Sequence, residues 1–173
     1  SSFWQVHRLA PEKFVTAVRD FANLQPGERL LDLYAGSGLF AASLAKDVGD
    51  SGVVVGVESS VDAVRNARRS CSDLGNLELV TADVTKWMQN NREQFDVIIL
   101  DPPRSGAGSS VVEAISHSAL RAVIYVSCDP SSLGRDTAYF AEHGWTLKNL
   151  VGFDAFPMTA HVECIALFTR TTG

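Results

Sequence analysis

The stretch RLLDLYAGSGLFAASLAKDVGDSGVVVGVE, residues 29–58, decides the fold class. An apolar run at 29–34 leads into a glycine-rich turn, a segment with apolar residues at helical spacing follows, and a second apolar run ends the stretch at 52–58. A strand, a tight turn, a helix and a strand in this order form a βαβ unit, whose strands are parallel in one sheet. The stretch therefore predicts an α/β domain.

The same alternation continues to the end of the chain, and it predicts a doubly wound sheet with helices on both faces. Further strands rich in Val, Ile and Leu are expected at 77–82, 95–101, 122–127 and 161–169. Helices are expected at 11–24, 38–48, 60–74, 84–93, 109–120 and 132–143.

Composition and charge limit the possible classes of function. The chain has 173 residues, 46% of them hydrophobic and 20% charged, as in a globular domain. No apolar run approaches the roughly 18 residues of a membrane span, and the N-terminus lacks the apolar core of a signal peptide. The three cysteines form no C-x-x-C pair, so we expect neither a disulfide scaffold nor a metal site, and a cytoplasmic protein.

The net charge of −5 lacks the basic excess usual in nucleic-acid binders. The densest basic cluster, in AVRNARRS at 63–70, has helical spacing and is interpreted as a solvated helix face. If the substrate is a nucleic acid, much of its phosphate binding must come from elsewhere.

Polar residues cluster where the predicted strands end. Ligands of doubly wound sheets bind at the carboxyl ends of the strands, so this placement predicts a site at that edge. The residues are Asp32, Tyr34, Glu58, Asp83, Asp101 and Cys128.

The glycine-rich turn predicts a cofactor site. Gly36 and Gly38 allow a tight turn and close approach of a ligand, although a purely structural turn is the alternative. Ala41 replaces the third glycine of the dinucleotide fingerprint, and the turn carries no phosphate-binding lysine. Glu58 is placed to accept hydrogen bonds from ribose hydroxyls, and Asp83 from an adenine amino group. An acid-lined adenosine site of this kind favours S-adenosylmethionine over NAD or ATP.

The segment LDPPRSG at 100–106 predicts a stiff loop that begins with Asp101, a candidate hydrogen-bond acceptor for a planar substrate. A rigid turn with a capping aspartate is the alternative. Amino-group methyltransferases that act on adenine carry D-P-P followed by an aromatic residue, and here Arg104 takes that place.

Taken together, these motifs resemble the catalytic domain of the RNA uridine-5-methyltransferases, which make 5-methyluridine in tRNA and large-subunit rRNA. The resemblance implies a Rossmann-like class I S-adenosylmethionine-dependent fold with a mostly parallel sheet and an antiparallel last strand. The matching motifs are FWQV (3–6), DLYAGSGLF (32–40), VVGVESS (54–60), DPPRSG (101–106), VSCDPSSLGRD (126–136) and FPMTAHVECIAL (156–167).

The resemblance also implies roles for individual residues. Cys128 matches the catalytic nucleophile and Glu163 the general base. Gln5, Tyr34, Glu58, Asp83 and Asp101 match positions that contact the cofactor and the uracil, and Gln5, Asp101 and Arg104 are the candidates for contact with substrate. The implied partner is tRNA or rRNA, bound by a monomer.

The chain departs from the family pattern at three positions. Asp129 stands where Asn usually follows the cysteine, and its charge is expected to oppose formation of a thiolate at Cys128. Arg104 or Arg135 is the candidate to compensate. Ala35 replaces a frequent Cys and Leu39 a cofactor-contacting Asn.

The sequence predicts one catalytic domain over residues 1–173, with a leading segment and helix at 1–25 and the Rossmann-like core at 26–173. The family's N-terminal RNA-binding domain and middle domain are expected to be absent. Because RNA affinity depends mainly on phosphate contacts, we expect cofactor binding without efficient turnover.

Chemistry supports the two catalytic candidates. Carbon 5 of uracil is a poor nucleophile until a thiolate adds to carbon 6, and a base must later remove the proton from carbon 5. A buried structural thiol is the alternative for Cys128, and a solvent-facing charge on an edge strand is the alternative for Glu163. Methylation of cytosine carbon 5 or of an adenine amino group, and a cofactor-binding RNA module without catalysis, remain open.

Overall fold

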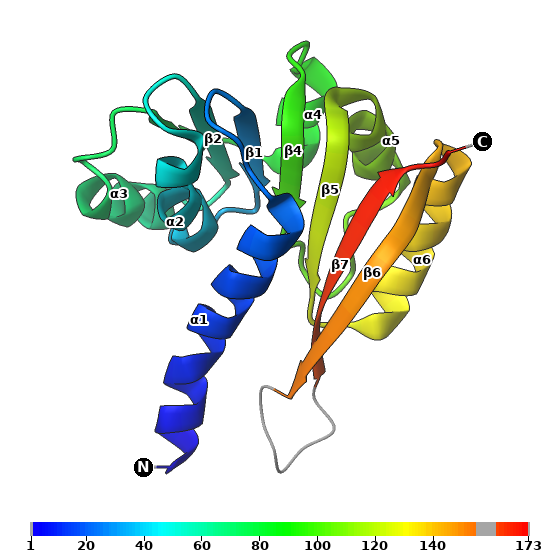
Figure 1. Ribbon diagram of the computed structural model, residues 1–173, viewed down its shortest axis with the longest axis horizontal. Helices are drawn as coiled ribbons and strands as arrows, with labels where there is room; N and C mark the ends of the chain where they lie inside the picture. Colours follow the sequence, from blue (N-terminus) through cyan, green and yellow to red (C-terminus); the bar gives the residue numbers. More distant parts are fainter. Residues whose placement is uncertain (1, 155–161, 173) are drawn as a thin grey trace.

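Seven strands form one sheet in the order β3-β2-β1-β4-β5-β7-β6 (Figure 1). The computed structural model describes residues 2–154 and 162–172, with side chains at 12–153 and 163–172. The strands are β1 (Arg29–Leu33), β2 (Val53–Glu58), β3 (Leu77–Thr81), β4 (Phe95–Leu100), β5 (Ala119–Ser127), β6 (Trp145–Asp154) and β7 (Val162–Arg170). The helices are α1 (Ser2–Ala22), α2 (Leu39–Val48), α3 (Val61–Ser70), α4 (Val84–Asn90), α5 (Ser109–Ser118) and α6 (Pro130–Glu142).

The first five strands are parallel, and β7 is antiparallel to both of its neighbours, β5 and β6. Helices α1 to α3 cover one face and α4 to α6 the other, each over its own apolar core (Figure 1). Side chains alternate across β5, for example, so Tyr125 faces α6 while Ile124 and Val126 face α1 and α2. The predicted doubly wound sheet with an antiparallel last strand is confirmed.

Two elements differ from the sequence prediction. Strand β6 was not predicted, because its register shifts between Leu147 and Asn149, and this irregularity interrupts the alternation that marks a strand. The first helix is predicted at 11–24, but α1 begins at Ser2. The helix ends at Ala22, close to the predicted end at residue 24. Asn23, directly after it, takes a left-handed conformation with φ 41°.

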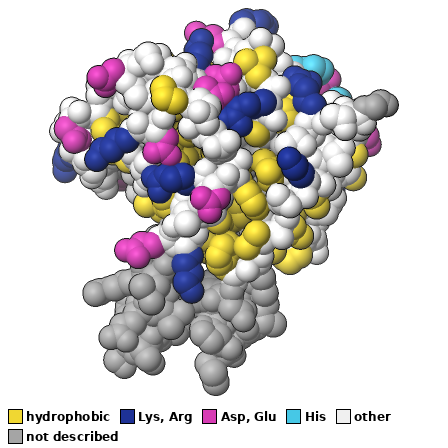
Figure 2. All heavy atoms as spheres, viewed as in Figure 1, with side chains coloured by type: hydrophobic (Ala, Val, Ile, Leu, Met, Phe, Trp, Pro, Cys, Tyr) yellow, Lys and Arg dark blue, Asp and Glu magenta, His cyan; other side chains and the backbone are white. Residues whose placement is uncertain are grey.

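Apolar side chains gather on the face formed by α1 and β6 (Figure 2). There they line a hollow of about 530 Å³ whose walls include Ala17, Phe21, Val151 and Phe153. This hollow contains none of the candidate site residues. Across the residues that the structure describes, no helix is long and apolar enough to cross a membrane.

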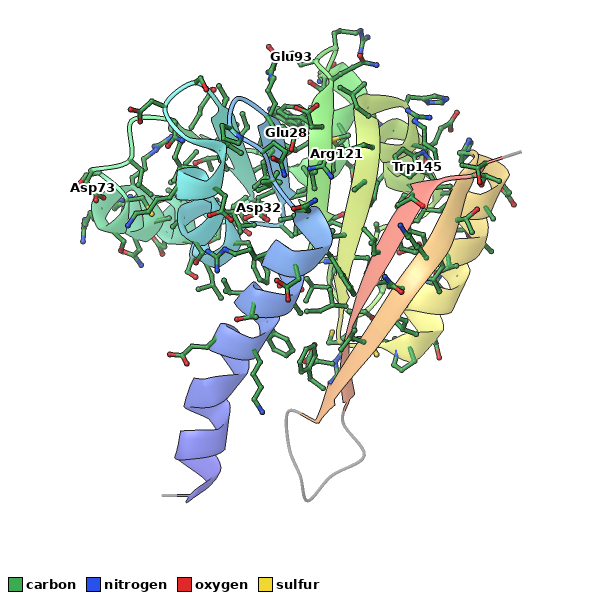
Figure 3. The ribbon with its side chains drawn as sticks, in the orientation of Figure 1. Glu28, Asp32, Asp73, Glu93, Arg121 and Trp145 are labelled. Atoms are coloured by element: carbon green, nitrogen blue, oxygen red, sulfur yellow. The ribbon has the colours of Figure 1, made fainter. Side chains whose placement is uncertain are left out.

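Arg121 on β5 fastens the end of α1 to the sheet. Its guanidinium donates hydrogen bonds to both carboxylate oxygens of Glu28, at 2.8 and 2.6 Å, and to the carbonyl oxygens of Ala22 and Asn23, at 2.8 and 3.1 Å. Figure 3 shows Glu28 and Arg121 side by side near the end of α1. The pair lowers the pKa of Glu28, chiefly through this hydrogen bond. The last carbonyls of α1 thus receive a charged donor from β5.

Replacing Arg121 should destabilise the protein. Arg121→Ala leaves the partly buried Glu28 carboxylate and two helix-end carbonyls without their donor, so we expect the free energy of unfolding to fall by about 2 kcal/mol. Urea denaturation measures it. Arg65→Ala is the matched control, because its ion pair with Asp62 is exposed and should contribute less than about 0.5 kcal/mol. Equal effects of the two substitutions would contradict the assignment.

Candidate active site

A pocket of about 340 Å³ opens at the carboxyl edge of the parallel strands. It brings together five of the residues predicted from the sequence, which come from four separate parts of the chain: Tyr34, Gly36, Asp101, Cys128 and Glu163. The remaining walls are formed by Phe14, Ala35, Ser37, Leu39, Phe40 and Val126.

The turn after β1 is shaped by left-handed backbone. Gly36 has φ 56° and Gly38 φ 81°, a region that favours glycine, and no atom lies within 4 Å of a β-carbon built at Gly36. Tyr34 also has a positive φ, 59°, which is unusual for a bulky side chain and marks strain at a functional turn. Burial, with smaller contributions from Asp136 and Asp83, raises the pKa of Tyr34 to about 12, so its hydroxyl stays protonated.

Glu58 holds the glycine-rich turn from the neighbouring strand. Its Oε1 accepts a hydrogen bond from the Gly36 amide at 2.9 Å, and its Oε2 accepts one from the Ser60 amide at 2.7 Å. A carboxylate can accept about four hydrogen bonds, so Glu58 retains capacity for a ligand. Glu58 and Gly38 lie beside the pocket rather than in its wall.

Asp83 lies one strand further out, after β3. It is exposed and caps helix α4, since its Oδ1 accepts a hydrogen bond from the Lys86 amide at 3.0 Å. Like Glu58, it lies outside the pocket wall. The two carboxylates thus extend the acidic edge of the site from β2 to β3.

Asp32 lies beneath the same turn and is fully buried. Its Oδ2 accepts a hydrogen bond from the Ala41 amide at 3.1 Å, while its Oδ1 has no partner among the described residues. Burial raises the pKa of Asp32 to about 8, and the carboxylates of Asp101 and Glu58 act in the same direction. Asp32 is therefore largely protonated at neutral pH, and it supports the start of α2 from inside the fold.

Strand pairing brings the two catalytic candidates together. Ser127 on β5 pairs with Cys164 on the antiparallel strand β7. Cys128 directly follows Ser127 and Glu163 directly precedes Cys164, so in this antiparallel register Cys128 lies level with Glu163, and both line the pocket. Because β7 lies between β5 and β6, Glu163 is not on an edge strand, which removes the alternative of a solvent-facing edge charge.

The pocket favours the protonated thiol of Cys128. Burial raises the pKa of Cys128, the carboxylates of Glu163 and Asp101 raise it further, and the guanidinium of Arg104 lowers it. Asp101 is exposed at the pocket, yet partial loss of hydration and, after it, the charge of Glu163 raise its pKa to about 6. The site therefore places a thiol beside two carboxylates that repel one another.

The expected effect of Asp129 on the thiol is not what the structure shows. Its carboxylate caps α6, accepting a hydrogen bond from the Ser131 amide at 3.1 Å, so its charge stabilises the helix start. The carboxylates that raise the pKa of Cys128 are instead those of Glu163 and Asp101. Of the two arginines expected to compensate, Arg104 lowers the pKa, whereas Arg135 donates a hydrogen bond to the Ser105 carbonyl.

The other substrate candidates are placed differently. Arg104 is exposed and lies outside the pocket wall, so it acts on Cys128 through charge. The side chain of Gln5 lies outside the described residues.

Sequence reasoning missed the apolar wall of the pocket. Phe14 reaches it from α1 and packs edge-on against Phe153 of β6, with ring centroids 5.1 Å apart. Leu39, where the family pattern has a cofactor-contacting residue, does line the pocket. Nothing in the local sequence of α1 marks Phe14, because the contact depends on how the helix crosses the sheet.

The family model of the tRNA (uracil-5-)-methyltransferases matches residues 1–171. The chain belongs to this family. It is 43% identical to an uncharacterized RNA methyltransferase of Streptomyces coelicolor, over 95% of this chain and 36% of that protein. It is 39% identical to the 23S rRNA (uracil(1939)-C(5))-methyltransferase RlmD of Acinetobacter baylyi, over 97% of this chain and 37% of that protein.

Among solved structures, this uracil-5-methyltransferase family member is similar to the tRNA (uracil-54, C5)-methyltransferase of Pyrococcus abyssi in complex with S-adenosyl-L-homocysteine. The TM-score is 0.73 at 31% identity, over 89% of this chain and 37% of that chain. Aeropyrum pernix fibrillarin, 20% identical with a TM-score of 0.67, shares the fold. The chain spans little more than a third of the length of the curated relatives it matches.

The charges around Cys128 predict opposite effects of two substitutions. Glu163→Gln removes a carboxylate that raises the pKa of Cys128, so thiol alkylation at pH 7.5 should accelerate about threefold or more, and its pH midpoint should fall. Arg104→Ala should slow alkylation and raise the midpoint. Iodoacetamide labelling, with the peptide of each cysteine quantified by mass spectrometry, separates Cys128 from Cys71 and Cys164.

Glu163→Asp is the matched control, because it retains the charge and should leave the midpoint close to that of the unaltered protein. If both Glu163→Gln and Arg104→Ala shifted the midpoint in the same direction, the assigned charge balance would be wrong.

Proposed function

We propose that this protein methylates carbon 5 of a uridine in RNA, with S-adenosylmethionine as methyl donor and a covalent bond between Cys128 and carbon 6 of the uracil. The observation that carries the proposal is the placement of Cys128 level with Glu163 in the wall of one pocket, with Asp101 and Gly36 beside them. Membership of the uracil-5-methyltransferase family supports uracil as the base that is methylated.

The pocket fits the cofactor chemically. The ammonium group, the ribose hydroxyls and the adenine amino group of S-adenosylmethionine are all hydrogen-bond donors, and the site offers the carboxylates of Asp101, Glu58 and Asp83 as acceptors. The open space above Gly36 allows close approach to the backbone. The complex of the Pyrococcus abyssi enzyme with S-adenosyl-L-homocysteine supports the same assignment.

Cys128 supplies the nucleophile. Its thiolate bonds to carbon 6 of the uracil, and the electron pair of the carbon 5–carbon 6 double bond moves onto the ring oxygen at carbon 4. Carbon 5 becomes nucleophilic and takes the methyl group, for which the bound cofactor supplies an activated sulfonium. The thiol proton must leave first, and the Asp101 carboxylate, which acts on the thiol in the same pocket, accepts it, so that Glu163 stays ionised for the later step.

Glu163 completes the reaction. As the carboxylate it removes the proton from carbon 5, the double bond between carbons 5 and 6 re-forms, and the Cys128 thiolate is expelled. Its position level with Cys128 supports this role. Asp101, whose backbone amide donates to the Leu33 carbonyl at 3.3 Å, is fixed at the end of β4 and accepts a hydrogen bond from a ring N–H. The RNA is tRNA or 23S rRNA, the two classes that the relatives' names contain.

Cofactor binding can be tested without RNA. Calorimetric titration with S-adenosylhomocysteine should show saturable binding, and Glu58→Ala should weaken it about tenfold or more, through loss of charged hydrogen bonds. Glu78→Ala on β3, outside the pocket wall, is the control and should bind normally. Absence of binding by the unaltered chain would remove the cofactor assignment.

Covalent trapping tests the reaction. With S-adenosylmethionine and 5-fluorouridine RNA, the unaltered protein should form an adduct stable to denaturing electrophoresis, because fluorine at carbon 5 cannot leave as a proton. Cys128→Ala should form none. With ordinary uridine RNA, Glu163→Gln should accumulate the adduct that the unaltered protein turns over.

The outcomes separate the rival functions. Methyl transfer that survives in Cys128→Ala would indicate an amino-group methyltransferase. Saturable cofactor binding without any adduct, in a protein that is otherwise folded, would indicate a binding module without catalysis.

A further inference from the structure

Asp136 is a fully buried carboxylate that the proposed reaction does not use. It lies on α6, opposite the loop of residues 101–108 that follows β4, hereafter the DPP loop. Its Oδ2 accepts hydrogen bonds from the Tyr125 hydroxyl at 2.6 Å and the Ala107 amide at 2.8 Å, and its Oδ1 accepts one from the Gly108 amide at 3.2 Å. These three donors explain how a carboxylate is accommodated at 0% exposure.

Two further side chains of α6 hold the same loop. The Ser132 hydroxyl donates a hydrogen bond to the Arg104 carbonyl, and the Arg135 guanidinium donates one to the Ser105 carbonyl at 2.5 Å. Residues 132, 135 and 136 lie on one face of the helix, at spacings of three and four residues. We refer to Tyr125, Ser132, Arg135 and Asp136 as the loop clamp.

The loop is packed tightly against the clamp. A β-carbon built at Gly106 would lie 2.8 Å from the Asp136 Oδ2 and 3.2 Å from the Ser132 β-carbon, and Gly106 has φ 85°. Only glycine fits that position without displacing the loop. Tyr125 keeps its proton for the bond to Asp136, because burial and that bond both raise its pKa.

The clamp connects the two sides of the pocket. Helix α6 begins at Pro130, two residues after Cys128, and the DPP loop begins at Asp101 and carries Arg104. Asp101 is held separately by the sheet, through its amide bond to Leu33. Among the described residues Arg104 has no such anchor in the sheet, and its carbonyl is instead bonded by the clamp. The backbone position from which the Arg104 side chain extends therefore depends on α6.

We propose that Asp136 is a positioning residue of the methyl-transfer site, which holds Arg104 of the DPP loop at a fixed place beside Cys128. This role rests on the proposed function, since only that reaction requires Cys128 as a nucleophile. The charged groups that face the thiol are Asp101 at the end of β4, Glu163 on β7 and Arg104 on the loop. Of these, Arg104 alone favours the thiolate, so releasing the loop removes the favourable charge and leaves the unfavourable ones.

The test is the pH dependence of Cys128 alkylation in Asp136→Asn. An amide has one acceptor oxygen where the carboxylate has two, so the bonds to the loop cannot all be kept. We expect the alkylation rate at pH 7.5 to fall about threefold, equivalent to half a pKa unit, and the midpoint to rise. Affinity for S-adenosylhomocysteine should be unchanged. Thr137→Ala is the matched control, because its hydroxyl bonds the Leu133 carbonyl within α6 and does not touch the loop.

A double-substitution cycle separates positioning from general support of the fold. In an Arg104→Ala background, Asp136→Asn should cause no further loss of alkylation, because the charge that it positions is already gone. An equal loss in both backgrounds would overturn the proposal, as would an unchanged alkylation profile in Asp136→Asn.

If Asp136→Asn does not fold, Tyr125→Phe removes one bond of Asp136 and should show the same change to a smaller extent. An unchanged profile in that variant would overturn the proposal. None of these measurements needs RNA. The fluorouridine adduct of the unaltered protein tests the proposed function independently. Failure of the positioning role of Asp136 therefore does not imply failure of the proposed function.

Discussion

The active site depends on the direction of one strand. β7 runs antiparallel to β5, so the beginning of β7 and the end of β5 lie at the same edge of the sheet. A parallel strand in that place would present its first residues at the opposite edge. The antiparallel direction therefore brings Glu163 level with Cys128, although they are 35 positions apart in the sequence.

The second determinant is the balance of charge in the pocket. Burial and the carboxylates of Glu163 and Asp101 raise the pKa of Cys128, and partial loss of hydration with the charge of Glu163 raises the pKa of Asp101. Such a site suits a ligand with many hydrogen-bond donors. A thiol that is mostly protonated is also less readily oxidised, because oxidation follows thiolate character.

The sequence predicted the architecture well, because Val-rich and Ile-rich strands alternating with amphipathic helices leave few alternatives. It also placed Tyr34, Gly36, Asp101 and Cys128 at one edge, since parallel strands end together. The sequence did not predict β6, because a register shift disrupts the alternation of its side chains. It also did not predict that Phe14 lines the pocket, because that contact depends on how α1 crosses the sheet. The bonds of Asp136 to the DPP loop join elements 28 and 29 positions apart, which no local pattern records.

The register shift in β6 has a consequence beyond prediction. β6 lies at the edge of the sheet, and Leu150 and Val151 on it are exposed. A long, flat and apolar edge would serve as a template on which strands of other molecules could add. The irregularity between Leu147 and Asn149 places Lys148 within that edge and bends the strand locally. A feature that hides the strand from pattern analysis is thus one of the means by which sheet edges discourage pairing with other molecules.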